Sequence, residues 1–245
     1  SSWNNKMGVK TKKFGPFAWK TLHALAKRAD ATKSYSEFQE LLCLLGMVIP
    51  CVYCRLSVRQ FLATDHTLDV KRIPHTSCEL FVYLLHNRVN RKLYLQERLK
   101  ATTDAERLAI KQKWDRYTPS FSQARESTLD THHQTFWIAC FTFLWYILCD
   151  FPAPDAKRRT GQSQLFFYQR FFELIGIITQ NKFYQEAFTS VQPLWSTTMT
   201  LGERMDVWFA LQKHMCRKAK IPLFIPSIQT LSTLAKEGIV GCVPT

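Results

Sequence analysis

Cys51 and Cys54 are the closest pair among the eight cysteines of this chain, and their spacing suits thiol chemistry. Two intervening residues bring two sulfurs within reach of a disulfide bond. Pro50 stops one helix and can begin the next, which places Cys51 at the positive end of a helix dipole. Arg55 and Arg59 add positive charge nearby. Because such surroundings stabilise a thiolate, the attacking species in disulfide exchange, the pair is predicted to be redox-active.

Three other interpretations fit the same pair. A zinc site usually needs four ligands, and without a second Cys-x-x-Cys they would have to come from distant residues: His66, His75, His214 and Cys216. Buried cysteines without a chemical role are common in apolar helices. A thioredoxin-like pair follows a strand, but the apolar residues 41–49 have no visible parallel-strand partners. We therefore prefer a helical redox pair and predict no metal site.

The other cysteines are sparse. Cys140 and Cys149 fall in a strongly apolar run and are expected to be inert core residues. Cys242 in the C-terminal tail is interpreted as a free thiol without a role, with a shuttle thiol as the alternative. A secreted disulfide scaffold would be shorter and denser in cysteine. No secretory signal opens the chain, so we expect an intracellular protein.

The elements that position the pair are predicted to be helices. Glycine is scarce, with 8 residues, apolar residues make up 46%, and no strand alternation is evident. Thr76 and Glu79 match a capping box that would start one of the helices. The predicted class is all-α, with two helical bundles in series. Helices are expected near residues 17–26, 38–49, 51–61, 78–93, 104–117, 131–150, 163–180, 181–191, 202–219 and 227–237.

Three segments are predicted along the chain. Residues 1–13 are polar and lysine-rich and are expected to form a flexible arm. Pro119 and a serine-rich stretch at 120–128 mark the boundary between a domain at 14–119 and a helical domain of unknown role at 120–245. The apolar run from Phe136 to Cys149 is shorter than the ~20 residues that cross a bilayer, so a buried helix and no membrane span are expected.

The net charge of +14 is concentrated in the first half of the chain, where residues 1–120 hold 21 Lys and Arg against 10 Asp and Glu. Such a surplus suits an anionic ligand such as a nucleic acid, an acidic membrane face or a cofactor pyrophosphate. A solvated basic surface explains it equally well. We expect no nucleic-acid binding, and the cluster at residues 157–159 is interpreted as a solvated loop.

Three segments resemble the Erv/ALR family of sulfhydryl oxidases in sequence, order and rough spacing. They are GPFAWKTLH at residues 15–23, PCVYC at residues 50–54 and HNRVNRKL at residues 86–93. The third matches the family signature His-Asn-x-Val-Asn-x-x-Leu and is the most specific. The resemblance covers residues 14–117 and implies a helical bundle that holds FAD.

The resemblance implies a cofactor role for two sets of residues. Trp19 and His23 are four residues apart, so they share a helix face, and they would pack on the adenine side of FAD. Taken alone, both are also typical of a helical core. Two asparagines inside a helix are harder to explain without a polar partner. The second set would hydrogen-bond to the cofactor, stack on it or contact its phosphates: His86, Asn87, Asn90, Arg91, Lys92 and Trp114.

The chain also departs from the family pattern. Pro16 stands where an arginine is frequent, and Tyr94 and Leu95 stand where a Gly-Lys pair is frequent. Tyr83 replaces a structural cysteine, and Cys78 is out of register with it, which puts the usual second disulfide in doubt. These losses and the extra helical domain are similar to viral members of the family, which act in the host cytoplasm or the virion.

The function implied by the resemblance is disulfide formation. A substrate dithiol in a protein would attack the pair at Cys51, the more exposed sulfur, while Cys54 would face the isoalloxazine. The flavin would reduce oxygen to hydrogen peroxide, and the family implies a homodimer. The rival class is a non-enzymatic basic helical protein that binds nucleic acid or a protein partner. A metal-binding helical module is a third.

Overall fold

The computed structural model describes residues 11–116, 118–152, 164–227 and 229–230. Within these residues every regular element is a helix and no strand occurs, so the predicted all-α class is confirmed. The α-helices are α1 (Thr11–Thr32), α2 (Tyr35–Val48), α3 (Val52–Thr64), α4 (Cys78–Arg98), α5 (Asp104–Arg116), α6 (Phe121–Glu126), α7 (Gln134–Cys149), α8 (Gln164–Thr179), α9 (Lys182–Val191) and α10 (Leu201–Ala219). Short 3-10 helices are η2 (His66–Leu68), η3 (Val70–His75) and η4 (Gln192–Leu194).

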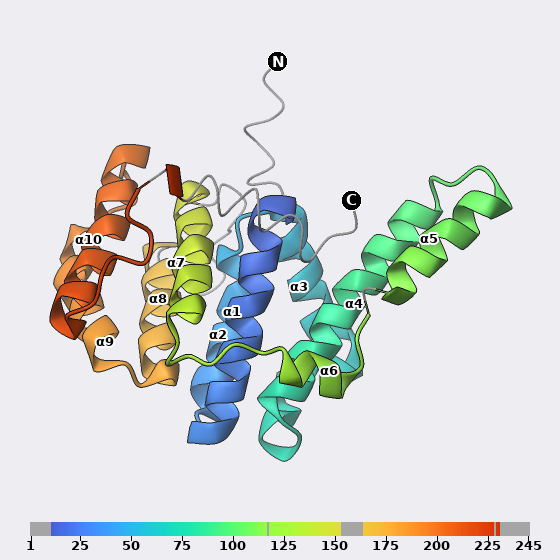
Figure 1. Cartoon of the computed structure of the whole chain (residues 1–245), viewed down its shortest axis with the longest axis horizontal. Coiled ribbons are helices and arrows are strands. Elements are labelled where there is room, and N and C mark those ends of the chain that lie inside the picture. The colour runs from blue at the N-terminus through green and yellow to red at the C-terminus, as the bar shows by residue number, and fades with distance from the viewer. Residues whose placement is uncertain (1–10, 117, 153–163, 228, 231–245) are drawn as a thin grey trace.

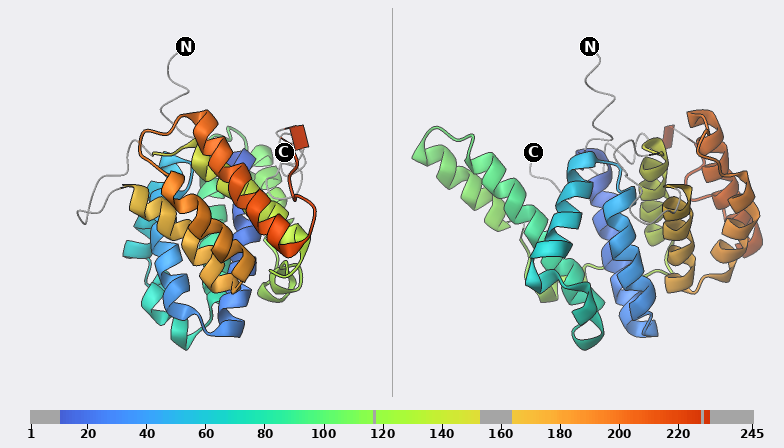
Figure 2. Two further views of the ribbon diagram at one scale, coloured as in Figure 1. Left: turned by 90° about the vertical axis from the view of Figure 1, so that its left-hand side faces the viewer. Right: turned by 180° about the vertical axis from the view of Figure 1, so that it is seen from behind.

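Helix α1 lies in the middle of the molecule and packs on both sides (Figure 1). It contacts α4 on one side and α7 on the other, while α2 contacts α3 and α8. The rings of Phe14 and Phe143 stack with centroids 6.5 Å apart. Figure 2 shows α9 and α10 together at one end and the α4–α5 hairpin projecting from the other. Residues on both sides of position 119 therefore share one hydrophobic core.

This shared core bears on the predicted division at residue 119. The division stays a prediction, but the two parts are not separate bundles placed in series, because α1 and α2 bury apolar side chains against α7 and α8. The serine-rich stretch 120–128, predicted to mark the domain boundary, contains the short helix α6. Ser120 and Gln123 form a reciprocal capping box at its start, a local signal that sequence reading missed.

The predicted N-terminal arm is too long by three residues. Residues 1–10 lie outside the described part of the chain, but α1 begins at Thr11 and contains Pro16. The helix starts early because Phe14 is buried against Phe143, and because the Thr11 hydroxyl lies 3.4 Å from the sulfur of Cys54. Contacts with distant residues outweigh the polar, lysine-rich local sequence here.

Helix α4 is tied to α1 at its start. Asp30 of α1 accepts hydrogen bonds from the backbone N–H groups of Cys78 and Glu79, at 2.8 and 3.0 Å. The N-cap is Ser77, whose hydroxyl accepts from the N–H of Leu80, so the capping box predicted at Thr76 was wrong by one residue. Capping satisfies donors that have no partner within the helix. These bonds hold α4 beside α1, and both helices line the site described below.

Helix α7 is the buried apolar helix that the sequence predicts, and Cys140 is fully enclosed in it. None of the described helices combines the length and the apolar character needed to cross a bilayer. Several predictions fall outside the described residues: the basic cluster at 157–159, Tyr117, Cys242 and most of the helix expected at 227–237.

Candidate redox and cofactor site

The thiol pair lies where α3 begins, as predicted. Cys51 is the N-cap of α3 with extended backbone angles of φ −156° and ψ 118°, and its sulfur accepts a hydrogen bond from the N–H of Cys54 at 3.3 Å. The Cys54 thiol donates to the Cys51 sulfur, and the two sulfurs are 2.6 Å apart. A sulfur at an N-cap satisfies an otherwise unpaired backbone donor and sits at the positive end of the helix. The pair is thus placed for reversible disulfide formation.

The two thiols differ in acidity. The pKa of Cys51 falls to about 6, chiefly because the Cys54 thiol donates to it, and this outweighs the effect of burial, which acts in the opposite direction. The pKa of Cys54 is raised, first because its proton is held by Cys51 and then because the group is buried. The Thr11 hydroxyl lowers both values. Near neutral pH, Cys51 is therefore the thiolate and Cys54 the thiol.

One expectation about the pair is wrong. Cys51 was expected to be the more exposed sulfur, yet the residue is only 6% exposed, whereas Cys54 is half-buried. The N-cap position turns Cys51 inward against Thr11 of α1, whose hydroxyl donates to its sulfur at 3.7 Å. Tyr53, between the two cysteines, is 59% exposed. Access to the pair is therefore not decided by the order of the cysteines along the helix.

Both sulfurs line a cavity of about 390 Å³ between α1, α2, α3 and α4, here called the thiol cavity. Its walls are largely apolar, with Phe14, Trp19 and Val89 among them. Lys92 of α4 also lines it, donates a hydrogen bond to the Ser57 hydroxyl and contributes, after the Thr11 hydroxyl, to lowering the pKa of Cys54. Lys92, predicted to contact phosphates, therefore lies with the thiols.

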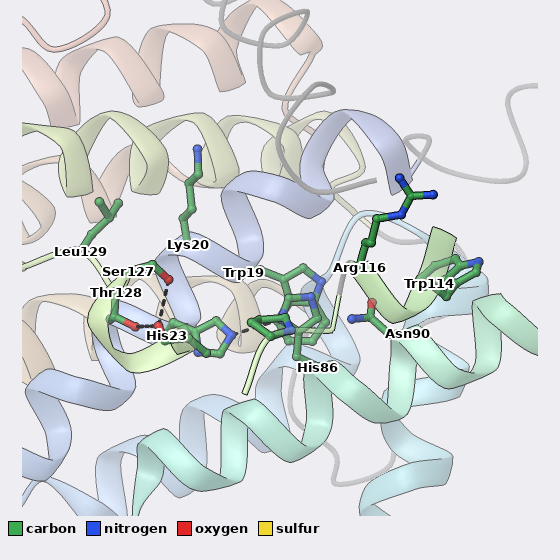
Figure 3. Close-up of a pocket in the computed structure, with 12 residues that line it drawn as sticks. Trp19, Lys20, His23, His86, Asn90, Trp114, Arg116, Ser127, Thr128 and Leu129 are labelled. Carbon is green, nitrogen blue, oxygen red and sulfur yellow. Dashed lines mark hydrogen bonds between the residues drawn. The ribbon is translucent and has the colours of Figure 1, made fainter. Parts of the chain in front are cut away.

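A second cavity of about 420 Å³ lies between α1, α4, α5 and the end of α6, and is here called the aromatic cavity (Figure 3). Trp19 lines both cavities, so they adjoin at this residue. Predicted site residues from three helices gather here: Trp19, His23, His86, Asn90 and Trp114. The structure thus brings together side chains that are up to 95 positions apart in the sequence.

Trp19, His23 and His86 form one stacked and hydrogen-bonded group. The rings of Trp19 and His86 stack with centroids 4.0 Å apart and planes 12° apart. His23 Nε2 lies 3.1 Å from His86 Nδ1. Burial lowers the pKa of His23 to about 4 and that of His86 to about 3, the latter also through the charge of His23. Both rings are therefore neutral at physiological pH, with polar atoms available to a bound partner.

Asn87 and Arg91 face a different hollow. They line a neighbouring space of about 270 Å³ that they share with Asn90 and Trp114. Asn87, predicted with His86 and Asn90 to contact the cofactor, does not line the aromatic cavity as they do, because adjacent residues point about 100° apart on a helix, whereas residues four apart lie on one face. Trp114 is fixed by Glu97, which accepts from its indole N–H at 2.7 Å and from Lys113 at 2.8 Å.

Sequence reasoning missed several residues of the aromatic cavity. Lys20 and Arg116 line it and bring positive charge. They were missed although Lys20 directly follows Trp19 and Arg116 lies two positions after Trp114. Ser127, Thr128 and Leu129 also line it, from the stretch expected to be a domain boundary. The Ser127 and Thr128 hydroxyls donate to the carbonyl of Ala124 at 3.0 and 2.8 Å, which fixes the end of α6 (Figure 3). Lys20 was detectable as a basic residue next to Trp19.

The two cavities fit the chemistry of FAD. Each lies within the range of about 300–1,000 Å³ typical of small-molecule sites. The thiol cavity has apolar walls and the two thiols, which suit a redox-active ring. The aromatic cavity has a neutral aromatic stack, which suits an adenine, and the cations Lys20 and Arg116, which suit phosphates. Within the described parts of the chain, no three His, Cys, Asp or Glu side chains cluster as metal ligands would.

Comparison with known proteins gives one family. The model of the Erv1 / Alr family matches residues 17–115, a range that contains the thiol pair, both histidines of the stack and Trp114. Searches of curated proteins and of solved structures gave no significant match. The match agrees with the resemblance seen in three sequence segments and with the helical fold. Residues 17–115 of this chain are therefore similar to the Erv1 / Alr family, whose model they match.

Proposed function

We propose that this protein is an FAD-dependent thiol oxidase that forms disulfide bonds in protein substrates and passes the electrons to oxygen, giving hydrogen peroxide. The observation that carries the proposal is that Cys51, Cys54 and Trp19 line one apolar cavity, while Trp19 also lines the aromatic cavity. A dinucleotide that spans both would have its redox ring at the sulfurs. The match of residues 17–115 to the Erv1 / Alr family supports the same activity.

The proposed cofactor contacts follow from the two cavities. Trp19, His23 and His86 would hold the adenine part, with Asn90 and Trp114 beside it. Lys20 and Arg116 would face the phosphates, with Arg91 and Asn87 near them across Trp114, and Lys92 would stabilise negative charge at the thiols. Once bound, FAD supplies a two-electron acceptor that oxygen reoxidises.

The thiol chemistry begins from the Cys51–Cys54 disulfide. A substrate thiolate attacks one sulfur, a mixed disulfide forms, and the other sulfur leaves as a thiolate. The second thiolate of the substrate then attacks the substrate sulfur of the mixed disulfide. The substrate is released with a new disulfide bond, and the second sulfur of the pair leaves as a thiolate. The pair has gained two electrons and two protons, and it gives them up again when its own disulfide re-forms.

Cys51 is assigned as the sulfur that exchanges with substrate, and Cys54 as the one that faces the flavin. The low exposure of Cys51 does not favour this assignment, but the low pKa of Cys51 does. A thiol of low pKa is a good leaving group when the substrate is released from a mixed disulfide. With this assignment, Cys54→Ser incubated with a substrate in its disulfide form should trap a mixed disulfide at Cys51, because the Cys51 thiolate attacks that disulfide and one substrate sulfur leaves as a thiolate. A mixed disulfide that forms only at Cys54, in Cys51→Ser, would reverse the two roles.

The proposed function is tested by oxygen uptake with a dithiol substrate. Cys54→Ser should abolish uptake and keep the yellow bound flavin, because the substitution removes one electron-carrying sulfur and little volume. Cys43→Ser is the matched control, since Cys43 is exposed on α2 and lines neither cavity. Full uptake in Cys54→Ser would refute the mechanism. A wild-type protein that stays colourless with added FAD and binds polyanions in a salt-sensitive way would favour the basic binding protein instead.

Other implications of the family stay predictions. These are the homodimer, the viral origin, and the location in the host cytoplasm or the virion. Helices α7 to α10 are proposed to form a unit that supports the oxidase part rather than one that acts separately, because they share its core.

A further inference from the structure

Arg55, which directly follows Cys54, is a charged side chain inside the core. It is 1% exposed, and its Nη1 atom donates to the carbonyl of Ile49 at 2.6 Å and to Asp150 Oδ2 at 2.5 Å. Asp150 is the C-cap of α7 and its side chain is 11% exposed. A buried guanidinium is strongly unfavourable unless its charge is paired and its donors are satisfied. Asp150 therefore stabilises the Arg55 side chain in this buried position.

The Ile49 carbonyl is the point at which this ion pair reaches the thiols. It accepts from Arg55 and also from the N–H of Cys51, at 2.7 Å, so it sets the turn that leads from α2 into the N-cap of α3. The placement of the Cys51 sulfur depends on that turn, because the N-cap geometry gives Cys51 its hydrogen bond from the Cys54 N–H. A shift of the Ile49 carbonyl is thus a shift of the redox pair.

The end of α7, which carries Asp150, is bonded to α10. Arg204 of α10 donates to the carbonyl of Leu148, at 3.0 Å, and to that of Phe151, the residues that flank the end of α7. The contacts therefore run from α10 through the end of α7 to Asp150, Arg55, the Ile49 carbonyl and Cys51. Arg55 and Asp150 are 95 positions apart, so the link joins the family part of the chain to the helices beyond it.

We propose that Asp150 is a positioning residue for thiol oxidation: acting through Arg55, it holds the turn at Ile49 to Cys51 in the geometry that disulfide exchange requires. The proposal rests on the proposed function and gives the helices beyond residue 120 a role in it. Asp150 touches neither thiol. It belongs to the reaction because a buried charge pair fixes one arrangement of the turn, whereas an apolar contact would allow several.

The test compares Asp150→Asn with Glu40→Gln in the full-length protein. Glu40 of α2 pairs with Arg170 of α8 at 2.8 Å, so it also bridges the two parts of the chain, but it has no bond to the redox turn. The main measurement is the pH dependence of Cys51 alkylation in the reduced protein, resolved by peptide mass mapping. It needs neither flavin nor oxygen, so its outcome is separate from that of the proposed function.

Asp150→Asn should raise the alkylation midpoint of Cys51 by about one pH unit, a tenfold loss of thiolate below the midpoint. It should lower kcat for dithiol oxidation by roughly 10- to 100-fold, as a misplacement of about 1 Å does, with the flavin retained and the KM for the thiol changed less. Glu40→Gln should leave both unchanged. Arg55→Met should resemble Asp150→Asn, and the double variant should be no worse than either, because the two residues act as one unit.

If Asp150→Asn does not fold, Asp150→Glu replaces it, since its longer arm keeps the charge and displaces the carboxylate. A smaller shift in the same direction is then expected. Folding is checked by thermal melting, and a variant counts as folded if its melting temperature lies above the assay temperature. A folded Asp150 variant with the alkylation midpoint and kcat of Glu40→Gln would overturn the proposal, and so would additive losses in the double variant.

Discussion

The cysteines at the start of α3 and those inside α7 share one residue type but have opposite chemistry. Burial raises the pKa of Cys140, and it raises that of Cys149 to about 12. Cys51 is also buried, at 6% exposure, yet its pKa falls to about 6. The difference lies in the hydrogen bonds that Cys51 accepts, chiefly from the Cys54 thiol and then from the Cys54 N–H at the N-cap. Reactivity in this molecule therefore follows the hydrogen bonds that a sulfur accepts, and burial without them makes a cysteine inert.

The largest expected effect is a difference in alkylation rate. In the reduced protein at pH 7, Cys51 should react roughly 10³-fold or more faster than Cys140, because reaction needs a thiolate and the two pKa values lie on opposite sides of pH 7. Peptide mapping after timed iodoacetamide treatment measures both sites in one sample. Equal rates for the folded protein would remove the basis of the comparison.

The next effect comes from Cys54→Ala. It removes the thiol that donates to Cys51, the main cause of its low pKa, so the pKa of Cys51 should rise toward its ordinary value. Alkylation of Cys51 at about pH 6.5 should then slow by roughly 10- to 100-fold. In wild-type protein the rate should fall tenfold per pH unit below about pH 6 and level off above it. A variant with an unchanged pH profile would show that the helix terminus alone sets the acidity.

The histidine stack gives a smaller effect, on stability. The folded-state pKa values of His23 and His86, about 4 and 3, lie below the ordinary value of 6.5, so the folded protein binds these protons more weakly than the unfolded chain. Their stabilisation is complete above pH 6.5 and is lost as the pH falls toward 4. Between about pH 7 and 5 the loss should be roughly 1–2 kcal/mol per histidine.

Urea unfolding of wild type and His86→Phe at the two pH values checks this effect of the histidines. The phenyl ring preserves the stack on Trp19 and cannot be protonated, so the variant should lose less stability on acidification. An equal loss in both proteins would mean that other groups cause it.

The smallest effect is expected from Thr11→Val. The Thr11 hydroxyl contributes less to the low pKa of Cys51 than Cys54 does, so its loss should raise that pKa by a few tenths of a unit and slow alkylation at pH 6 a few-fold at most. The branched shape is preserved, so melting should change little. If Thr11→Val slowed alkylation of Cys51 as much as Cys54→Ala does, the Thr11 hydroxyl of α1, and not the Cys54 thiol, would be the main cause of the low pKa of Cys51.

Much of the fold was predictable because helix signals are local. The run of helices from α1 to α10 follows apolar periodicity, and Pro50 located the start of α3 next to Cys51. Small errors arose where distant contacts decide the boundary, as at Thr11. The shared core of α1 and α7 could not be predicted, since nothing near Phe14 indicates that it will meet Phe143.

The site divides in the same way. Trp19, His86, Asn90 and Trp114 were predicted from motifs and meet around one cavity. Arg116 and the segment 127–129 were missed because their place depends on how α5 and α6 fold back over α1. The ion pair of Arg55 and Asp150 joins residues 95 positions apart, and nothing in the local sequence indicates that Arg55 pairs with Asp150.

The central claim is that electrons pass from the Cys51–Cys54 pair to a flavin held between α1, α3 and α4. Its most direct test is anaerobic titration of the FAD-loaded protein with a dithiol while the visible flavin absorbance is followed. The account predicts bleaching in wild type and Cys43→Ser, no bleaching in Cys54→Ser, and recovery of the colour when oxygen is admitted. Bleaching of Cys54→Ser at the wild-type rate would contradict it.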